Sequence, residues 1–207
     1  MKQLTTTSYA LLGLLGLRSW TTYELAQQME RSLRNFWPRA QSKLYEEPKN
    51  LVAHGLAESK RQQVGRRPRT VYSISAKGRD ALRAWLDEPG MPWSLESEAL
   101  LKVFFADQGS KAQLMAQVRH IRDWASMERE RGLTFVRDYA DLGGPFPERL
   151  HVIALMVGFL TRMNEAVLDW SAWAEEEVNN WRDTGGPGDR EIFRRLLERS
   201  ESNVGRD

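Results

Sequence analysis

The chain has 207 residues, 41% of them hydrophobic, so it can bury a core, and these values exclude a wholly disordered protein. Its net charge of +2 hides an asymmetry, because residues 1–88 hold 15 basic and 8 acidic residues, a net +7, whereas residues 89–207 carry −5. A basic first part and an acidic second part predict a polyanionic partner for the first part only. The absence of cysteine excludes disulfides and thiolate chemistry and is typical of a cytoplasmic protein.

Two helices are predicted at the start of the chain. The first, over residues 5–17, is compact and apolar and follows threonines that can serve as its N-cap. The second covers roughly residues 22–34, and Thr21 or Thr22 can cap it. Its Leu25, Met29 and Leu33 repeat at i, i+4 and i+8, which is the spacing of one buried helix face.

A third helix is predicted between Pro38 and Gly55, where Gly55 occupies the position of a C-terminal capping glycine. Pro48 interrupts the pattern, because proline lacks the N–H that would bond the carbonyl of Leu44. The helix therefore either kinks at Pro48 or begins its regular portion near Glu47. The residues predicted to face inward are Leu44, Leu51 and Val52.

The apolar period changes after the third helix. Residues 56–64 and 69–75 are predicted strands joined at the Gly-Arg-Arg-Pro turn, with Tyr72 and Ile74 on one face. Ser75 can then cap a fourth helix, which Pro89 ends. Three helices, a hairpin and a helix in fewer than 90 residues predict a winged helix-turn-helix.

The rest of the chain is predicted to be helical, after a linker at residues 89–94. Breaks are expected at Gly109 and over 143–147, and a short helix with a frayed tail is expected after residue 188. The main predicted helices cover about residues 96–107, 111–135 and 148–182.

The last of these helices carries an apolar stripe with alternating four- and three-residue spacing, which a helix cannot bury alone. We therefore predict a helical, dimer-forming arm. The apolar run 152–160 has nine residues, about half of what a bilayer span needs, so no membrane segment is expected. The stripe consists of Val152, Met156, Phe159, Met163, Val167, Trp170, Ala174, Val178 and Trp181.

The predicted fold class is mainly α, with an N-terminal winged helix-turn-helix, a two-stranded wing and an all-helical C-terminal domain. The expected DNA-binding domain is 1–88. The expected dimerisation and possible effector domain is 96–182, followed by a short helix and flexible tail over 183–207.

Three stretches, taken in order, resemble the PadR family of bacterial transcriptional regulators. They are SYALLGLLGLRSWTTYELAQQMERS, SKLYEEPKNLVAHGLAES and GRRPRTVYSISAKGRDALRAWL, and they cover about residues 5–88. The acidic second half resembles the longer C-terminal helical domain of one branch of the family. The chain departs from the commoner family pattern at Pro48. The resemblance implies a dimeric DNA-binding repressor, often released by a small aromatic effector.

The candidate DNA-binding residues lie on the third helix and on the hairpin. Gln, Ser and Lys can hydrogen-bond base edges in a major groove, while Arg and Tyr also bind phosphates. The alternative for the helix is an ordinary solvated face, which Glu46 and Glu47 favour. The alternative for Lys60 and Arg61 is protection of an exposed strand edge. The candidates are Arg39, Gln41, Ser42, Lys43, Tyr45 and Lys49 on the helix, and Arg61, Arg66, Arg67 and Arg69 on the hairpin. Arg18, Arg31 and Arg34 either add phosphate contacts or are solvated surface.

Tryptophan is abundant, with eight residues, three of them close together near the end of the long last helix. Trp170, Trp173 and Trp181 either line an aromatic effector pocket or pack in the dimer seam, and their stripe spacing favours packing. Trp170 and Trp181 are eleven residues apart, which predicts a shared helix face.

No residue set with catalytic or metal-binding spacing is found, so an enzyme, a metal site and a cofactor are not expected. The predicted function is that of a homodimeric transcriptional regulator, more specifically a repressor, on an inverted-repeat operator. The alternative is a winged-helix scaffold that assembles a protein complex without specific DNA binding.

Overall fold

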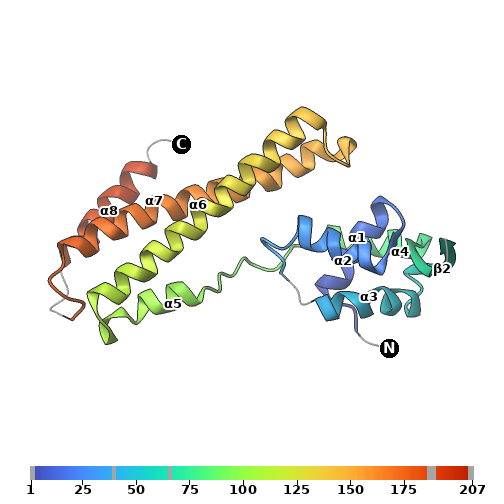
Figure 1. Cartoon of the computed structure of the whole chain (residues 1–207), viewed down its shortest axis with the longest axis horizontal. Helices are drawn as coiled ribbons and strands as arrows, with labels where there is room; N and C mark the ends of the chain where they lie inside the picture. The colour runs from blue at the N-terminus through green and yellow to red at the C-terminus, as the bar shows by residue number, and fades with distance from the viewer. Residues whose placement is uncertain (1–2, 39–40, 65–66, 186–189, 205–207) are drawn as a thin grey trace. The chain divides into compact units, whose positions relative to one another are not determined.

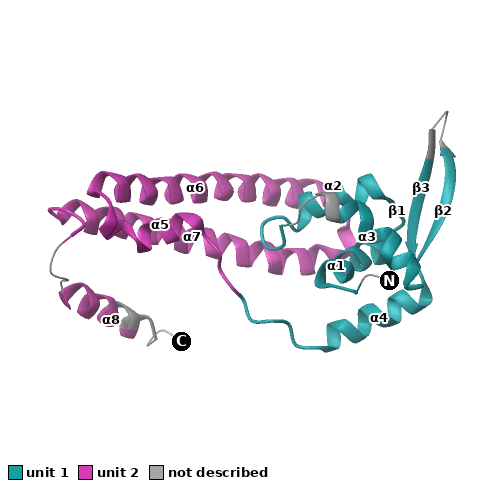
Figure 2. Cartoon of the chain, turned by 90° about the horizontal axis from the view of Figure 1, so that it is seen from below, with its two compact units in different colours: residues 1–93 teal, residues 94–207 magenta. Residues whose placement is uncertain are grey.

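The computed structural model describes residues 3–38, 41–64, 67–185 and 190–204 (Figure 1). The chain divides into two compact units, Met1–Trp93 and Ser94–Asp207 (Figure 2). The division falls within the stretch 88–97, which contains no helix or strand.

Unit 1 contains four helices and a three-stranded antiparallel sheet among its described residues. Strands β2 and β3 form a long hairpin, and β3 is central in the order β1-β3-β2. The two-residue strand β1 was not predicted, and it pairs Trp20 with Tyr72 and Thr21 with Val71. The elements are α1 (Thr6–Leu17), β1 (Trp20–Thr21), α2 (Thr22–Ser32), α3 (Gln41–Ala53), β2 (Ala57–Val64), β3 (Arg67–Ile74) and α4 (Ala76–Asp87).

Hydroxyl side chains start three of these helices. Thr5 and Thr21 form capping boxes at α1 and α2, and Ser75 accepts a hydrogen bond from the backbone N–H of Gly78 at the start of α4. Each cap satisfies an N–H group that the helix itself leaves unbonded. The predicted cap residues of all three helices are therefore confirmed.

Leucines from α1, α2 and α3 form the core of unit 1. Leu11, Leu12, Leu25 and Leu51 have no exposed surface. Trp20 is also buried, and its indole Nε1 donates to the carbonyl of Leu14 at 2.7 Å, so the one polar group of the ring is satisfied. This core holds α3 and the base of the hairpin in one rigid arrangement.

Unit 2 is entirely helical in its described residues. Helix α6 (Lys111–Leu142) ends seven residues later than predicted, and α7 (Leu150–Asn180) ends two residues earlier than predicted. Helix α8 (Arg190–Val204) continues through residues where a frayed tail was expected. Gly143 follows α6 in the left-handed conformation, with φ of 74°, as a C-terminal capping glycine does. The elements are α5 (Glu98–Phe104), the 3-10 turn η1 (Ala106–Gln108), α6 (Lys111–Leu142), the 3-10 turn η2 (Pro147–Arg149), α7 (Leu150–Asn180) and α8 (Arg190–Val204).

Helices α6 and α7 pack as an antiparallel pair (Figure 1). At one end of the pair, Leu114, Met115, Val118, Ala174 and Val178 form a buried cluster. At the same end, Lys111 Nζ donates to the carbonyls of Asn179 and Trp181 at 2.8 and 2.6 Å, where it satisfies acceptors at the C-terminus of α7.

The predicted apolar stripe of α7 is only partly buried within the chain. Of its members, Ala174 and Val178 are buried, whereas Val152 and Phe159 are 46% and 47% exposed. Among the described residues, the segment Pro147–Asn180 is long and apolar enough to cross a membrane by length and composition, and 6% of its most apolar window is buried. The prediction that no segment is long enough to span a membrane was based on residues 152–160 alone, and it underestimated the length of this apolar helix.

Candidate nucleic-acid interface

Helix α3 is anchored to α1 through a buried glutamate. Glu47 is 4% exposed, and its Oε1 accepts hydrogen bonds from the Ser8 hydroxyl at 2.5 Å and from the Asn50 amide at 3.0 Å. Ser8 is itself 1% exposed. Because a buried polar group is costly unless it is hydrogen-bonded, this arrangement ties the position of α3 to that of α1.

α3 is helical from Gln41 and continues through Pro48. The alternative in which its regular portion begins near Glu47 is therefore wrong. Pro48 is buried together with Leu44 and Leu51, so its ring contributes to the core where the missing N–H would otherwise cost a hydrogen bond. Val52, predicted to face inward, is half-buried.

The opposite face of α3 is exposed and carries two of the candidate DNA-binding residues. Tyr45 is 42% exposed and Lys49 is exposed one turn later. Glu46 shares this surface, but Glu47 does not, because its carboxyl group is buried against Ser8. The exposed face is consequently less acidic than the sequence indicated, which favours an approach to phosphates.

The remaining helix candidates are only partly described. Gln41, Ser42 and Lys43 occupy the first turn of α3, and their side chains are not described. Arg39 lies outside the described residues. The described backbone therefore places Gln41, Tyr45 and Lys49 four residues apart on one helix, which puts them along one side of it.

The hairpin presents basic residues on both of its faces. Arg61 pairs with Thr70, and Gln62 pairs with Arg69, so Arg61 and Arg69 point to opposite faces of the ribbon. Both arginines are exposed, as is Lys60. A projecting ribbon with positive charge on both sides can approach phosphates on either wall of a groove.

The strand β3 begins two residues earlier than predicted. Val64 pairs with Arg67, so Arg67 and Pro68 belong to β3 instead of the turn. The side chain of Arg67 is not described, and Arg66 lies outside the described residues.

The start of α2 lies near the base of the hairpin. The pKa of Glu24 is lowered, chiefly by hydrogen bonds with Thr21, and in smaller part by the positive charges of Arg18 and Arg69. The backbone N–H of Thr21 donates to the Glu24 carboxylate at 2.7 Å. Arg69 therefore lies on the exposed hairpin surface, and its positive charge also stabilises the Glu24 carboxylate at the N-terminus of α2.

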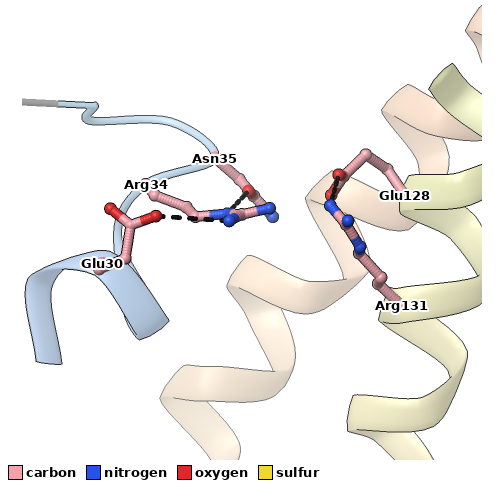
Figure 3. A network of polar contacts seen from close by, with 5 residues as sticks. All are labelled: Glu30, Arg34, Asn35, Glu128 and Arg131. Atoms are coloured by element: carbon pink, nitrogen blue, oxygen red, sulfur yellow. Dashed lines mark hydrogen bonds and ion pairs between the residues drawn. The ribbon is translucent and has the colours of Figure 1, made fainter. Parts of the chain in front are cut away.

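Two of the other arginines considered for phosphate contact already have partners inside unit 1. The guanidinium of Arg18 lies over the Trp20 ring, 3.7 Å from its centroid. Arg34 donates to Glu30 and Asn35 at 3.3 Å (Figure 3). Because Arg18 and Arg34 already contact other residues of unit 1, these contacts favour a structural role at the surface over a role in binding phosphates.

The three tryptophans considered for an effector pocket lie in two different environments. Trp170 and Trp173 are half-buried against the cluster of α6 and α7. Trp181 follows the end of α7 in an extended conformation and is 39% exposed. The predicted shared face of Trp170 and Trp181 is therefore wrong, because the helical period ends before Trp181.

Sequence reasoning missed two residues that position α3. Glu47 was read as part of an exposed face, although Leu44, Glu47, Pro48 and Leu51 share the i, i+3, i+4, i+7 spacing that indicates its burial. Lys77 was not considered, and its Nζ donates to the carbonyl of His54 at the C-terminus of α3, at 3.0 Å. No local sequence signal identifies that long-range contact.

Two family models match the chain. Residues 11–84 match the transcriptional regulator PadR-like family, and residues 96–179 match the virulence activator alpha C-terminal model. A probable transcriptional regulator of Mycobacterium tuberculosis is 27% identical over 175 residues, which cover 78% of this chain and 92% of that protein. The negative transcriptional regulator PadR of Bacillus subtilis is 28% identical over 100 residues, covering 47% of this chain and 54% of that protein.

Solved structures agree with these matches at the level of the fold. Bacillus subtilis PadR in complex with operator DNA has a TM-score of 0.73 at 17% identity, over 84% of this chain and 99% of that chain. The same protein in complex with p-coumaric acid has a TM-score of 0.68 at 19% identity, over 85% and 100% of the two chains. The predicted winged-helix fold and the prediction of a regulator in place of an enzyme are confirmed. Over residues 11–84 the chain belongs to the PadR-like family of transcriptional regulators, and residues 96–179 add a region that matches the virulence activator alpha C-terminal model.

Proposed function

We propose that this protein is a cytoplasmic homodimeric repressor that binds an inverted-repeat operator through α3 and the β2–β3 hairpin. The proposal rests on the presence of two features in the same unit. Helix α3 has an exposed polar face, and the β2–β3 hairpin is basic on both of its faces. A recognition helix in the major groove beside a basic wing is the usual docking geometry of winged helix-turn-helix proteins.

The proposed roles follow from side-chain chemistry. Gln41, Ser42 and Lys43, in the first turn of α3, would contact base edges, since the N-terminal part of a recognition helix is the part that reaches them. Tyr45 and Lys49, further along the exposed face, would bind phosphates together with Arg39. Arg61, Arg66, Arg67 and Arg69 would contact phosphates or enter the minor groove from the hairpin.

Self-association is supported by the uncovered apolar surface of unit 2. Val152, Leu155 and Phe159 are 46–77% exposed along the N-terminal half of α7. Such a contiguous apolar helix face is rare on a monomer and marks a surface that another chain covers. A two-fold dimer would present two copies of α3, so the operator would be an inverted repeat.

An effector is supported by chemistry known for a relative. Bacillus subtilis PadR has been solved with p-coumaric acid, and this chain carries Trp170, Trp173 and the partly exposed Trp181 in unit 2. We propose a small aromatic effector that releases the operator. Quenching of tryptophan fluorescence by a panel of aromatic acids, repeated with Trp181→Phe, measures binding and reports whether Trp181 is involved.

The test of DNA binding is a salt titration on the protein's own upstream DNA. Arg66→Ala combined with Arg67→Ala should lower the slope of log affinity against log salt by roughly one unit for each lost phosphate contact. The matched control is Arg83→Ala, which removes an arginine from α4 that is paired with Asp80 at 2.9 Å. Equal slopes for the hairpin variant and the control would contradict the hairpin assignment.

The rival function is a winged-helix scaffold that assembles a protein complex. It predicts no gel shift of upstream DNA even at low salt, whereas the repressor predicts a shift that salt weakens. A pulldown of genomic DNA with the purified protein then gives the operator and its symmetry.

A further inference from the structure

The ladder of backbone hydrogen bonds in helix α3 is broken at Pro48, between the turn with the candidate base contacts and the turn that leads into the hairpin. The proline ring lacks the N–H that would donate to the carbonyl of Leu44. Proline also disfavours helical backbone angles in the residue before it, and that residue, Glu47, is helical in this structure. The backbone therefore couples residues 41–47 to the rest of α3 less firmly than it would in an uninterrupted helix.

The part of α3 after Pro48 is held by contacts of its own. Leu51 has no exposed surface, and its carbonyl accepts the backbone N–H of Leu56 at 2.9 Å, just before β2 begins. The Nζ group of Lys77 donates to the carbonyl of His54 at 3.0 Å and adds a contact with α4. These contacts fix the end of α3 to the hairpin and to α4 without involving the residues before Pro48.

The part of α3 before Pro48 is held by the first turn of α1. Among its described side chains, only those of Leu44 and Glu47 are buried. The Ser8 hydroxyl donates to Glu47 Oε1 at 2.5 Å and accepts the backbone N–H of Thr5 at 2.8 Å. Because buried hydrogen bonds in a chain strengthen one another, this network joins the start of α1 to α3 at the residue directly before the proline.

Glu47 also spans the proline within α3. Its Oε1 accepts a hydrogen bond from the side-chain amide of Asn50 at 3.0 Å, and Asn50 belongs to the part of α3 after Pro48. An apolar side chain of similar length would fill the same space without the cost of desolvating a carboxyl group. The hydrogen bonds add a fixed distance and direction, as a single buried asparagine does when it sets the register of a coiled coil.

We propose that Glu47, acting through Ser8 and Asn50, is a positioning residue for DNA recognition that fixes the first turns of α3 across the break at Pro48. It contacts no DNA itself. Its hydrogen bonds set where residues 41–45 stand relative to the hairpin, and so whether base contacts and phosphate contacts form together. The consequence for operator choice rests on the proposed function, whereas the difference between the two parts of α3 does not.

Amide hydrogen exchange of the free, full-length protein tests the difference between the two parts of α3. Glu47→Met removes the acceptor and keeps a side chain of similar length, whereas Glu47→Gln keeps an acceptor oxygen and should exchange as the wild type does. In Glu47→Met, exchange at residues 45–47 should rise at least about tenfold, and exchange at residues 51–53 should change less than about threefold. Equal changes in both parts, no change in Glu47→Met, or a Glu47→Gln variant that exchanges like Glu47→Met overturns the proposal.

The DNA measurement compares the affinity for the protein's own upstream DNA with the affinity for mixed-sequence DNA of the same length. Glu47→Met should lower this ratio at least about tenfold, because base contacts are displaced. Its affinity for mixed-sequence DNA should stay within about twofold of the wild type, because the hairpin arginines are unchanged. Glu47→Gln should keep the wild-type ratio.

The matched control is Trp20→Phe, which removes a buried hydrogen bond from the same unit, the one to the carbonyl of Leu14, and leaves α3 unchanged. A ratio that is unchanged in Glu47→Met, or lowered as much in Trp20→Phe, contradicts the positioning role. If the wild-type protein shows no preference for its upstream DNA, the repressor function falls. Hydrogen exchange then still decides whether Glu47 positions the first turns of α3.

Discussion

Gly78, in the first turn of α4, offers a test in which local propensity and tertiary packing predict opposite results. A methyl group added at Gly78 would meet the Leu56 carbonyl oxygen at 2.0 Å and Ile74 Cγ1 at 2.9 Å. Cβ atoms do not approach other atoms closer than 3.0 Å, so Gly78→Ala requires a shift of about 1 Å. The same carbonyl accepts the backbone N–H of Ser75 at 3.0 Å, so the shift also disturbs the start of α4.

The magnitude follows from three opposing contributions. Overpacking costs about 1–3 kcal/mol, and the weakened hydrogen bond of Ser75 costs about 1 kcal/mol. Alanine is a better helix former than glycine and offsets about 1 kcal/mol. The net expectation for Gly78→Ala is a loss of roughly 2 kcal/mol, which lowers the unfolding temperature of a unit of this size by about 10 °C.

The assay is thermal unfolding of the full chain by far-UV circular dichroism, with hydrogen exchange of peptides from α4 and the hairpin to assign the transition to unit 1. Gly13→Ala is the matched control, since a Cβ at Gly13 in α1 has no atom within 4 Å. This variant should gain about 0.5–1 kcal/mol. If Gly78→Ala unfolds at or above the wild-type temperature while Gly13→Ala behaves as expected, the packing argument is refuted.

Three other changes have defined outcomes. Glu47→Ala removes the acceptor for Ser8 and Asn50 and should cost about 2–3 kcal/mol in urea unfolding, and a loss below 0.5 kcal/mol would show that α3 is held by its apolar face alone. The folded-state pKa of Glu24 is lowered below its ordinary value of 4.5, so the stability that Glu24→Gln loses at pH 7 should vanish as pH falls through that lowered pKa, and a difference independent of pH would contradict this. Lys111→Met removes two hydrogen bonds at the end of α7 and should increase hydrogen exchange there, at a cost of about 1 kcal/mol, whereas unchanged exchange would mean that solvent replaces Lys111.

The sequence predicted the order and type of the main elements because their signals are local. Thr5, Thr21 and Ser75 precede apolar periodic segments and cap α1, α2 and α4 as expected. The hairpin could be predicted because the spacing of apolar residues changes from the helical period of 3.6 residues to the strand period of 2. The basic hairpin and the polar face of the third helix were likewise readable from residue types, whereas their contacts with DNA stay predictions.

Other features depended on contacts between residues far apart in the chain. Strand β1 has two residues and no periodicity, and it exists because Trp20 and Thr21 pair with β3. The sequence left open whether α3 continues through Pro48. The hydrogen bond lost with the missing N–H is a local effect, whereas the stabilisation from burying the proline ring depends on contacts with other parts of the fold. Glu47 was misread for the same reason, since its partner Ser8 is 39 residues away.

The sequence by itself therefore determined the winged-helix order, the charge asymmetry and the helical second unit, all of which follow from neighbouring residues. Only the tertiary structure decided which apolar residues of α7 are covered within one chain and which stay exposed. An apolar stripe with heptad-like spacing shows that a helix face must be buried, but it carries no information on whether the covering residues come from the same chain. That distinction depends on how α6 packs against α7, and it leaves Val152, Leu155 and Phe159 of α7 exposed within one chain.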